Sequence, residues 1–111
     1  KKLDFLVVQD IFSTETARLA HVVLPGASFA EKEGTFTNVE RRIQKLSRAF
    51  DPLTNSKADW DIICMLAQAM GYDFDYISPA QIFEELVRIS PIHAKMNWED
   101  LGETGKQWEM I

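Results

Sequence analysis

Cysteine is almost absent from this chain: Cys64 stands alone among 111 residues. One cysteine excludes an internal disulfide and any multi-cysteine zinc or iron–sulfur site within the sequence. No apolar run approaches the roughly 18 residues of a membrane-spanning helix, and the five glycines form no glycine-rich phosphate loop. These absences argue against a disulfide scaffold, a membrane span and an independent nucleotide-binding protein.

Basic side chains are also in the minority, with 12 Lys and Arg against 17 Asp and Glu and a net charge of −5. Such a chain repels phosphate backbones, so we expect no nucleic-acid partner. The charge is uneven, because residues 31–50 carry +2 and the remainder therefore carries −7. A basic strip of this kind suits a small anionic ligand or a partner subunit. Without a recognisable signal peptide, we expect a cytoplasmic location, or a periplasmic one if the parent protein has an export signal elsewhere.

The chain has the length of one globular domain, and 46% of its residues are apolar. It is too short for a two-domain dehydrogenase or a TIM barrel. We expect a hydrophobic core around Val7, Val23, Ile63 and Leu86. Because the expected sheet has few strands, we also expect the chain to be cut from a larger domain.

Hydrophobic patterning in the first quarter of the chain predicts a strand, a short helix and a second strand. Residues 3–8 form an apolar run typical of a strand that is buried on both faces. Residues 13–20 begin with hydroxyl side chains suited to helix capping, and residues 21–24 form a second β-branched run. This order is typical of a βαβ crossover, which places the chain in the α/β class.

Residues 35–48 predict either two short strands or an irregular extended segment, and two helices follow. The first helix is expected over residues 59–70, with Ser56 or Asp59 as its cap and Gly71 after its end. The second begins at Ser78, with Pro79 in the first turn, and ends at residues 90–91. Residues 92–111, which contain two tryptophans, read as a docking tail.

Asp10 is the first candidate for chemistry, because it follows a predicted buried strand. Ligands of open α/β sheets bind beyond the carboxyl ends of the strands, where a carboxylate can accept both hydroxyl protons of a ribose. Ser13 and Thr14 follow and can present hydroxyls to a phosphate. The alternative is local: Asp10 bonds turn amides, and Ser13 or Thr14 only caps the helix.

Lys32 and Asp59 form a second candidate pair, because together they match guanine. A carboxylate accepts from the N1–H and exocyclic amine of that base, and a lysine donates to its O6 or to a phosphate. The alternative is that Lys32 belongs to a solvated Glu-Lys-Glu triplet and Asp59 caps a helix. Arg41 and Arg42 can clamp an anion, or one of them can pair with Glu40.

No residue set in the sequence predicts catalysis or a metal site. Cys64 lies among apolar residues and reads as a core residue, and His21 and His93 are far apart. We therefore assign no catalytic residue and no metal ligand to this chain.

Several spaced blocks resemble the molybdopterin oxidoreductases, and most of all the catalytic alpha subunits of formate dehydrogenases. They are residues 7–17, 20–25, 30–44, 57–63 and 70–72, in matching order, and the likeness spans residues 3–90. One departure is His21, where the family usually has aspartate.

The resemblance implies a partial Rossmann-like dinucleotide-binding domain over residues 1–91, with a short, mostly parallel sheet flanked by helices. Residues 92–111 would dock on it or lead to the next domain. The parent enzyme would oxidise formate, or reduce carbon dioxide, at molybdenum or tungsten held by two molybdopterin guanine dinucleotides. Family positions that contact the guanosine of one dinucleotide match Gln9, Asp10, Thr14, Lys32 and Asp59.

The catalytic residues and iron–sulfur cluster of such an enzyme would lie outside this chain, so we expect the isolated chain to be inactive and without bound cofactor. Its partners would be the rest of the catalytic subunit and electron-transfer subunits. The alternative is a structural or subunit-docking domain without cofactor, as in the large iron–sulfur subunit of NADH dehydrogenase.

Overall fold

A computed structural model describes residues 2–108, so residues 1 and 109–111 of the predicted domains lie outside the described part. The chain divides into two compact units. The first contains the residues up to Lys32 together with Arg48–Asp73, and the second contains Glu33–Ser47 and the residues from Phe74 onward. The predicted domain boundary at residue 91 stays a prediction.

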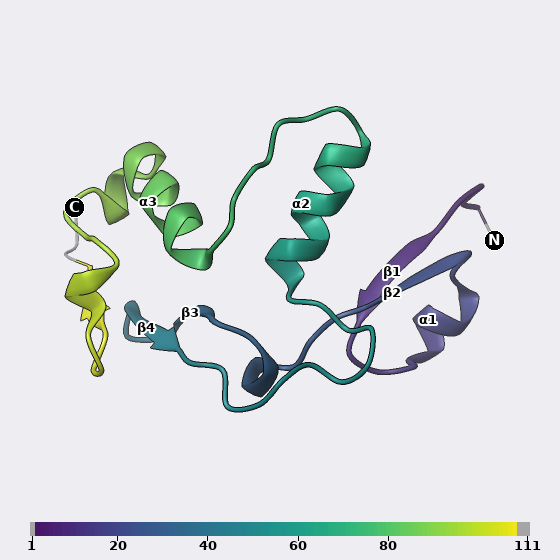
Figure 1. The fold of residues 1–111 in the computed structure, drawn as a ribbon, viewed down its shortest axis with the longest axis horizontal. Helices are drawn as coiled ribbons and strands as arrows, with labels where there is room; N and C mark the ends of the chain where they lie inside the picture. Colours follow the sequence, from purple (N-terminus) through teal and green to yellow (C-terminus); the bar gives the residue numbers. More distant parts are fainter. Residues whose placement is uncertain (1, 109–111) are drawn as a thin grey trace. The chain divides into compact units, whose positions relative to one another are not determined.

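The first unit contains the predicted crossover. Strands β1 (Val7–Asp10) and β2 (Val22–Pro25) pair in parallel, with Asp10 opposite Pro25, and helix α1 (Glu15–Leu19) connects them (Figure 1). The βαβ order is therefore confirmed, although the first strand begins at residue 7 rather than 3. The mixed architecture confirms the α/β class.

Helix α2 (Asp59–Ala69) follows the predicted range but not the predicted cap. Its N-cap is Ala58, which has no side-chain oxygen, so the assignment of Ser56 or Asp59 as the cap was wrong. The Ser56 hydroxyl instead donates to the Leu53 carbonyl at 2.8 Å. Asp59 lies in the first turn, where the helix dipole favours a negative charge. At the other end Gly71 has a φ of 86°, the left-handed conformation that glycine adopts most easily.

The expected core was largely wrong for the first unit. Val7 and Val23 are 45% and 46% exposed, because two short strands and a five-residue helix cover little of either sheet face, and Ile63 of α2 is 53% exposed. The buried apolar residues of this unit are instead Ala17, Ala27, Ile62 and Cys64. The core position predicted for the cysteine is confirmed, and desolvation by burial raises the pKa of its thiol.

The second unit is built on an antiparallel sheet. Strands β3 (Gly34–Thr37) and β4 (Arg42–Leu46) form the predicted pair, and β5 (Lys106–Gln107) adds to the outer edge of β4. The turn between β3 and β4 is held by the Asn38 side chain, which accepts the Glu40 and Arg42 N–H groups at 2.9 and 3.0 Å. These bonds stabilise the tight reversal that sets the strand register.

Helix α3 (Pro79–Ile89) starts as predicted, with the Ser78 hydroxyl accepting the Gln81 N–H at 3.4 Å. It contributes Phe83 to the core of the second unit, which consists of Ile43, Phe83, Met96 and Leu101. Partly buried side chains surround that core: Leu86, Val87, Trp98 and Trp108. Residues 92–108 therefore pack beside α3 and β4 (Figure 1).

Short 3₁₀ turns connect the remaining segments: Phe29–Glu31 in the first unit, and Pro91–His93 and Glu99–Leu101 in the second. None of the helices within residues 2–108 has the length and apolar character that a membrane crossing requires.

The core of the second unit predicts that shortening side chains of α3 lowers the free energy of unfolding by very different amounts at buried and exposed positions. Phe83 is 3% exposed and its ring lies 5.8 Å from that of Trp98, so Phe83→Ala should lower the free energy of unfolding by about 3–5 kcal/mol. Ile89, at the end of the same helix, is 72% exposed, and Ile89→Ala should change it by only about 0.5 kcal/mol. Urea unfolding followed by circular dichroism measures both; equal losses would contradict this core assignment.

Candidate functional site

Asp59 is the centre of a polar cluster in the first unit. Its Oδ1 accepts a hydrogen bond from the Gln9 amide at 2.6 Å, and its Oδ2 pairs with the Lys32 ammonium. The three side chains come from β1, from the residue after a 3₁₀ turn and from the start of α2. The fold therefore joins residues up to 50 positions apart, including both members of the predicted Lys32–Asp59 pair.

The cluster keeps Asp59 charged. Partial burial opposes the charged form, but the hydrogen bonds from Lys32 and Gln9 and the charge of Lys32 outweigh it, so the pKa of the Asp59 carboxyl lies below its ordinary value. The Asp59 side chain is 47% exposed and that of Lys32 19%. The carboxylate can therefore accept further donors from a ligand, while the ammonium is largely enclosed.

The Asp59 carboxylate lies near Gly26, which follows the end of the parallel sheet. The Gly26 N–H donates to the Asp10 carbonyl at 3.1 Å. A Cβ at Gly26 would lie 3.4 Å from Asp59 Oδ1 and 3.9 Å from the backbone carbon of Asp10. Gly26 therefore lies beside both the Asp59 carboxylate and the Asp10 backbone, at the carboxyl ends of β1 and β2, where ligands of parallel sheets bind.

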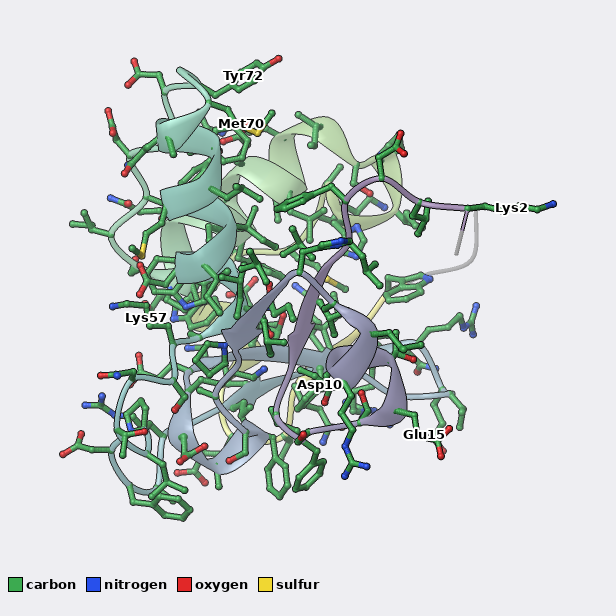
Figure 2. The ribbon with its side chains drawn as sticks, turned by 90° about the vertical axis from the view of Figure 1, so that its right-hand side faces the viewer. Lys2, Asp10, Glu15, Lys57, Met70 and Tyr72 are labelled. Atoms are coloured by element: carbon green, nitrogen blue, oxygen red, sulfur yellow. The ribbon has the colours of Figure 1, made fainter. Side chains whose placement is uncertain are left out.

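Asp10 and Thr14 make the local bonds that the alternative interpretation describes. Asp10 Oδ1 accepts the Phe12 N–H at 3.0 Å, in the loop that leads from β1 to Glu15 (Figure 2). The Thr14 hydroxyl accepts the Ala17 N–H at 3.2 Å and caps α1. A contact of either residue with a nucleotide stays a prediction.

Sequence reasoning missed the role of Glu31, which it grouped with a solvated triplet. Glu31 is 5% exposed, and its two carboxylate oxygens accept the Ser28 N–H at 2.7 Å and the Leu53 N–H at 2.9 Å. These backbone donors, that of Ser28 first, hold the pKa of Glu31 below its ordinary value. The signal was present, because a serine followed three residues later by glutamate is the pattern of a capping box.

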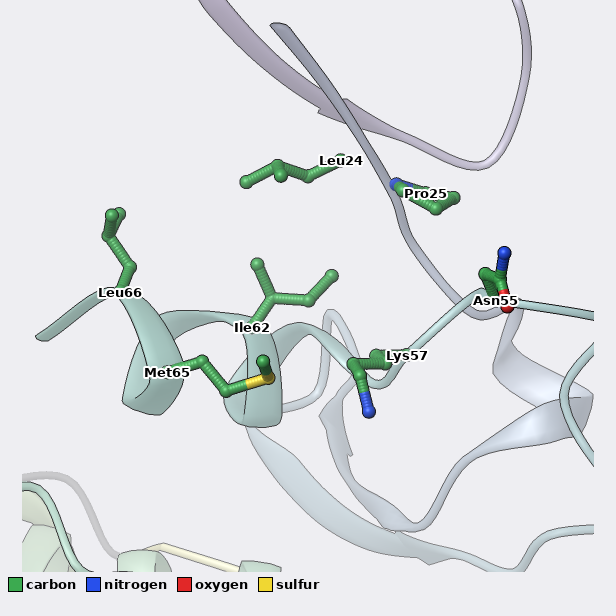
Figure 3. A pocket seen from close by; sticks show the side chains of 7 residues that line it. All are labelled: Leu24, Pro25, Asn55, Lys57, Ile62, Met65 and Leu66. Atoms are coloured by element: carbon green, nitrogen blue, oxygen red, sulfur yellow. The ribbon is translucent and has the colours of Figure 1, made fainter. Parts of the chain in front are cut away.

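An apolar cavity of about 330 Å³ lies between β2 and α2. Leu24 of β2 and Ile62 and Leu66 of α2 line opposite walls (Figure 3). Lys57, on the rim, forms an ion pair with Asp61 at 3.6 Å. The cavity offers apolar packing and adds no acid–base group to the polar cluster.

Among the remaining residues singled out in the sequence, Arg42 and His21 have structural partners. The Arg42 guanidinium donates to the Gly105 carbonyl at 3.1 Å, and Arg41 occupies the turn before β4 with a φ of 64°. The His21 ring accepts the Leu6 N–H through Nδ1 at 2.9 Å and stacks on Phe5. Across residues 2–108, no group of three or more acidic, histidine or cysteine side chains is arranged to hold a metal ion.

The lowered pKa of Asp59 predicts a pH-dependent contribution to stability. The carboxyl binds a proton more weakly folded than unfolded, so its contribution is present above the unfolded pKa, about 3.9, and is lost as the pH falls through the folded pKa. Asp59→Asn should therefore lower the free energy of unfolding at pH 7 and flatten its decline in acid. Urea unfolding between pH 2 and 7 measures this.

Asp61→Asn is the matched control, because it removes a carboxylate from the same helix turn whose ion pair with Lys57 is longer, at 3.6 Å. Surface pairs of that kind contribute little. An acid profile that Asp59→Asn leaves as steep as that of the unmodified chain would show that the cluster does not stabilise the charged carboxylate.

Comparison with known proteins supports the sequence resemblance. The family model for molybdopterin oxidoreductases matches residues 1–69. A formate dehydrogenase alpha subunit of Methanococcus maripaludis is 50% identical over 110 residues, covering 97% of this chain. A probable oxidoreductase of Bacillus subtilis is 52% identical over 109 residues, again with 97% of the chain covered. The chain spans 16% and 11% of the lengths of these two relatives.

A solved structure has a similar fold over almost the whole chain. The acetylene hydratase of Pelobacter acetylenicus superposes with a TM-score of 0.71 at 28% identity, over 96% of this chain and 15% of that one. The family match covers the whole of β1, β2, the Gln9–Lys32–Asp59 cluster and α2. The chain therefore belongs to the molybdopterin oxidoreductase family.

Proposed function

We propose that this chain contributes guanosine contacts to one molybdopterin guanine dinucleotide in a formate dehydrogenase-like enzyme. The observation that carries the proposal is the half-exposed Asp59 carboxylate, which Lys32 and Gln9 hold at the carboxyl ends of two parallel strands. Membership of the family supports a molybdopterin cofactor in the parent protein. The relationship to formate dehydrogenase alpha subunits supports formate as its substrate.

The chemistry of the cluster fits guanine better than adenine. Guanine presents N1–H and an exocyclic amine on one edge, and a carboxylate accepts from both. Each oxygen of Asp59 has a second lone pair besides the one used by Gln9 or Lys32. Lys32 would donate to O6 or to a phosphate, and Gln9 would hold the carboxylate in place. Adenine offers an acceptor at N1, which a carboxylate repels.

Asp10 and Thr14 would extend the contacts from the base to the ribose and its neighbouring polar group. Asp10 has a second oxygen besides the one that accepts the Phe12 N–H, and the Thr14 hydroxyl keeps its proton free to donate while it caps α1. When bound, the cofactor would supply the molybdenum or tungsten centre at which formate is oxidised. The residues of this chain would hold its guanosine end.

This chain would supply none of the residues that carry out catalysis or electron transfer in the parent protein. The metal-ligating residue, the iron–sulfur cluster and the contacts to electron-transfer subunits would belong to other parts of the parent protein. We accordingly expect no formate oxidation by this chain alone, measured as reduction of a viologen dye by formate. Turnover by the purified chain would contradict the division of roles proposed here.

A chimeric enzyme tests the guanosine contacts directly. The sequence of this chain would replace the matched segment of the Methanococcus maripaludis alpha subunit, to which it is 50% identical. Acid hydrolysis of the purified protein releases guanosine monophosphate, which chromatography counts per polypeptide. Asp59→Ala should weaken binding of the contacted dinucleotide by roughly tenfold or more, as expected for the loss of a paired base contact, so the guanosine count at limiting cofactor should fall.

Asp61→Ala is the control, because it removes a carboxylate of the same helix turn that pairs with Lys57. It should leave the guanosine content unchanged. An equal content in the Asp59→Ala protein would overturn the guanine assignment and would favour the alternative of a structural or subunit-docking domain.

A further inference from the structure

Glu31, the sequence neighbour of Lys32, is the buried charged side chain among residues 2–108. We infer that Glu31 is a positioning residue for the Lys32–Asp59 pair, through the backbone segments that carry the two partners. This inference rests on the proposed function, in which the Lys32–Asp59 pair contacts guanosine.

Glu31 joins two stretches of chain that are far apart in sequence. One carboxylate oxygen accepts the Ser28 N–H at 2.7 Å, and the other accepts the Leu53 N–H at 2.9 Å, 22 residues further on. The neighbouring Ala30 carbonyl adds a parallel link, because it accepts the Ala49 N–H at 2.8 Å. The 3₁₀ turn at Phe29–Glu31 is therefore fastened to residues 49–53 by side-chain and backbone bonds together.

Each fastened stretch leads directly to one member of the pair. Lys32 immediately follows Glu31 with an extended backbone. On the other side, residues 53–58 lead into α2, whose first residue is Asp59. The bonds from the Ala27 N–H to the Lys57 carbonyl at 2.7 Å, and from the Lys57 N–H to the Pro25 carbonyl at 3.1 Å, close the second side of the loop.

The two sets of links leave little freedom between Lys32 and Asp59. A lysine side chain is long and has many rotamers, so holding its ammonium against one carboxylate costs conformational entropy. Lys32 is nevertheless only 19% exposed and bonded to Asp59. A fixed backbone on both sides lowers that cost, because fewer relative positions of the Lys32 and Asp59 backbones remain accessible.

If Glu31 acted only through its charge, it would raise the pKa of Asp59 instead of lowering it. A carboxylate next to Lys32 competes with Asp59 for the ammonium and, acting through space, raises the pKa of Asp59. Removing that negative charge should therefore lower the pKa of Asp59 if Glu31 acts only electrostatically. Loss of positioning should raise it, because Lys32 would spend less time on the carboxylate.

The sign of this shift is the test. The pKa of the Asp59 carboxyl is followed by carbon NMR titration of the full chain, unmodified and with Glu31→Gln. Positioning predicts a rise of roughly 0.5–1 pH unit, part of the shift that a neighbouring cation produces. Lys32→Met gives the upper limit for the loss of the ammonium.

Glu33→Gln is the matched control, since it removes the same charge from the other neighbour of Lys32 at an exposed position. It should leave the pKa of Asp59 unchanged or slightly lower. Glu31→Asp keeps the charge but shortens its reach, so it should also raise the pKa of Asp59, which keeps the test valid if Glu31→Gln unfolds the chain.

A pKa of Asp59 that stays unchanged or falls in both Glu31 variants would overturn the inference. That outcome is separate from a failure of the proposed function. Guanosine content that does not respond to Asp59→Ala would remove the nucleotide contact while leaving the NMR result as it stands.

Discussion

The interaction between the Asp59 carboxylate, the Lys32 ammonium and the Gln9 amide is the constraint on which the candidate site depends. It joins a strand, a 3₁₀ turn and a helix start that the sequence separates by up to 50 positions. A carboxylate in the first turn of a helix is already favoured by the helix dipole. The two donors add to this, so Asp59 stays ionised while half of its surface remains open to a ligand.

The first unit exposes part of this cluster and buries only a small apolar core. Its buried apolar residues are few, and most of them are small: Ala17, Ala27, Ile62 and Cys64. Backbone hydrogen bonds and the buried Glu31 carboxylate supply the order that packing supplies in the second unit. There the core of Ile43, Phe83, Met96 and Leu101 has two tryptophans packed against it, Trp98 and Trp108.

Local patterns in the sequence predicted the elements well. Hydrophobic patterning predicted the βαβ crossover and the two strands within residues 35–48. Capping chemistry predicted the helix end at Gly71 and the cap at Ser78. The prediction of a core around Val7, Val23 and Ile63 failed because an apolar strand or helix face is buried only if neighbouring elements cover it. Glu31 was missed because its burial depends on the Leu53 N–H, a partner that no local pattern identifies.

Chemistry grouped Lys32 with Asp59 as candidate contacts to guanine; the two side chains form an ion pair, and their contact with guanine stays a prediction. A crystal structure of the full-length protein with its cofactor bound is the most direct measurement. The N1 and exocyclic amine of one guanine should lie about 2.7–3.2 Å from the Asp59 carboxylate, the range of ordinary hydrogen bonds. A guanosine bound elsewhere, with Asp59 still bonded only to Lys32 and Gln9, would contradict it.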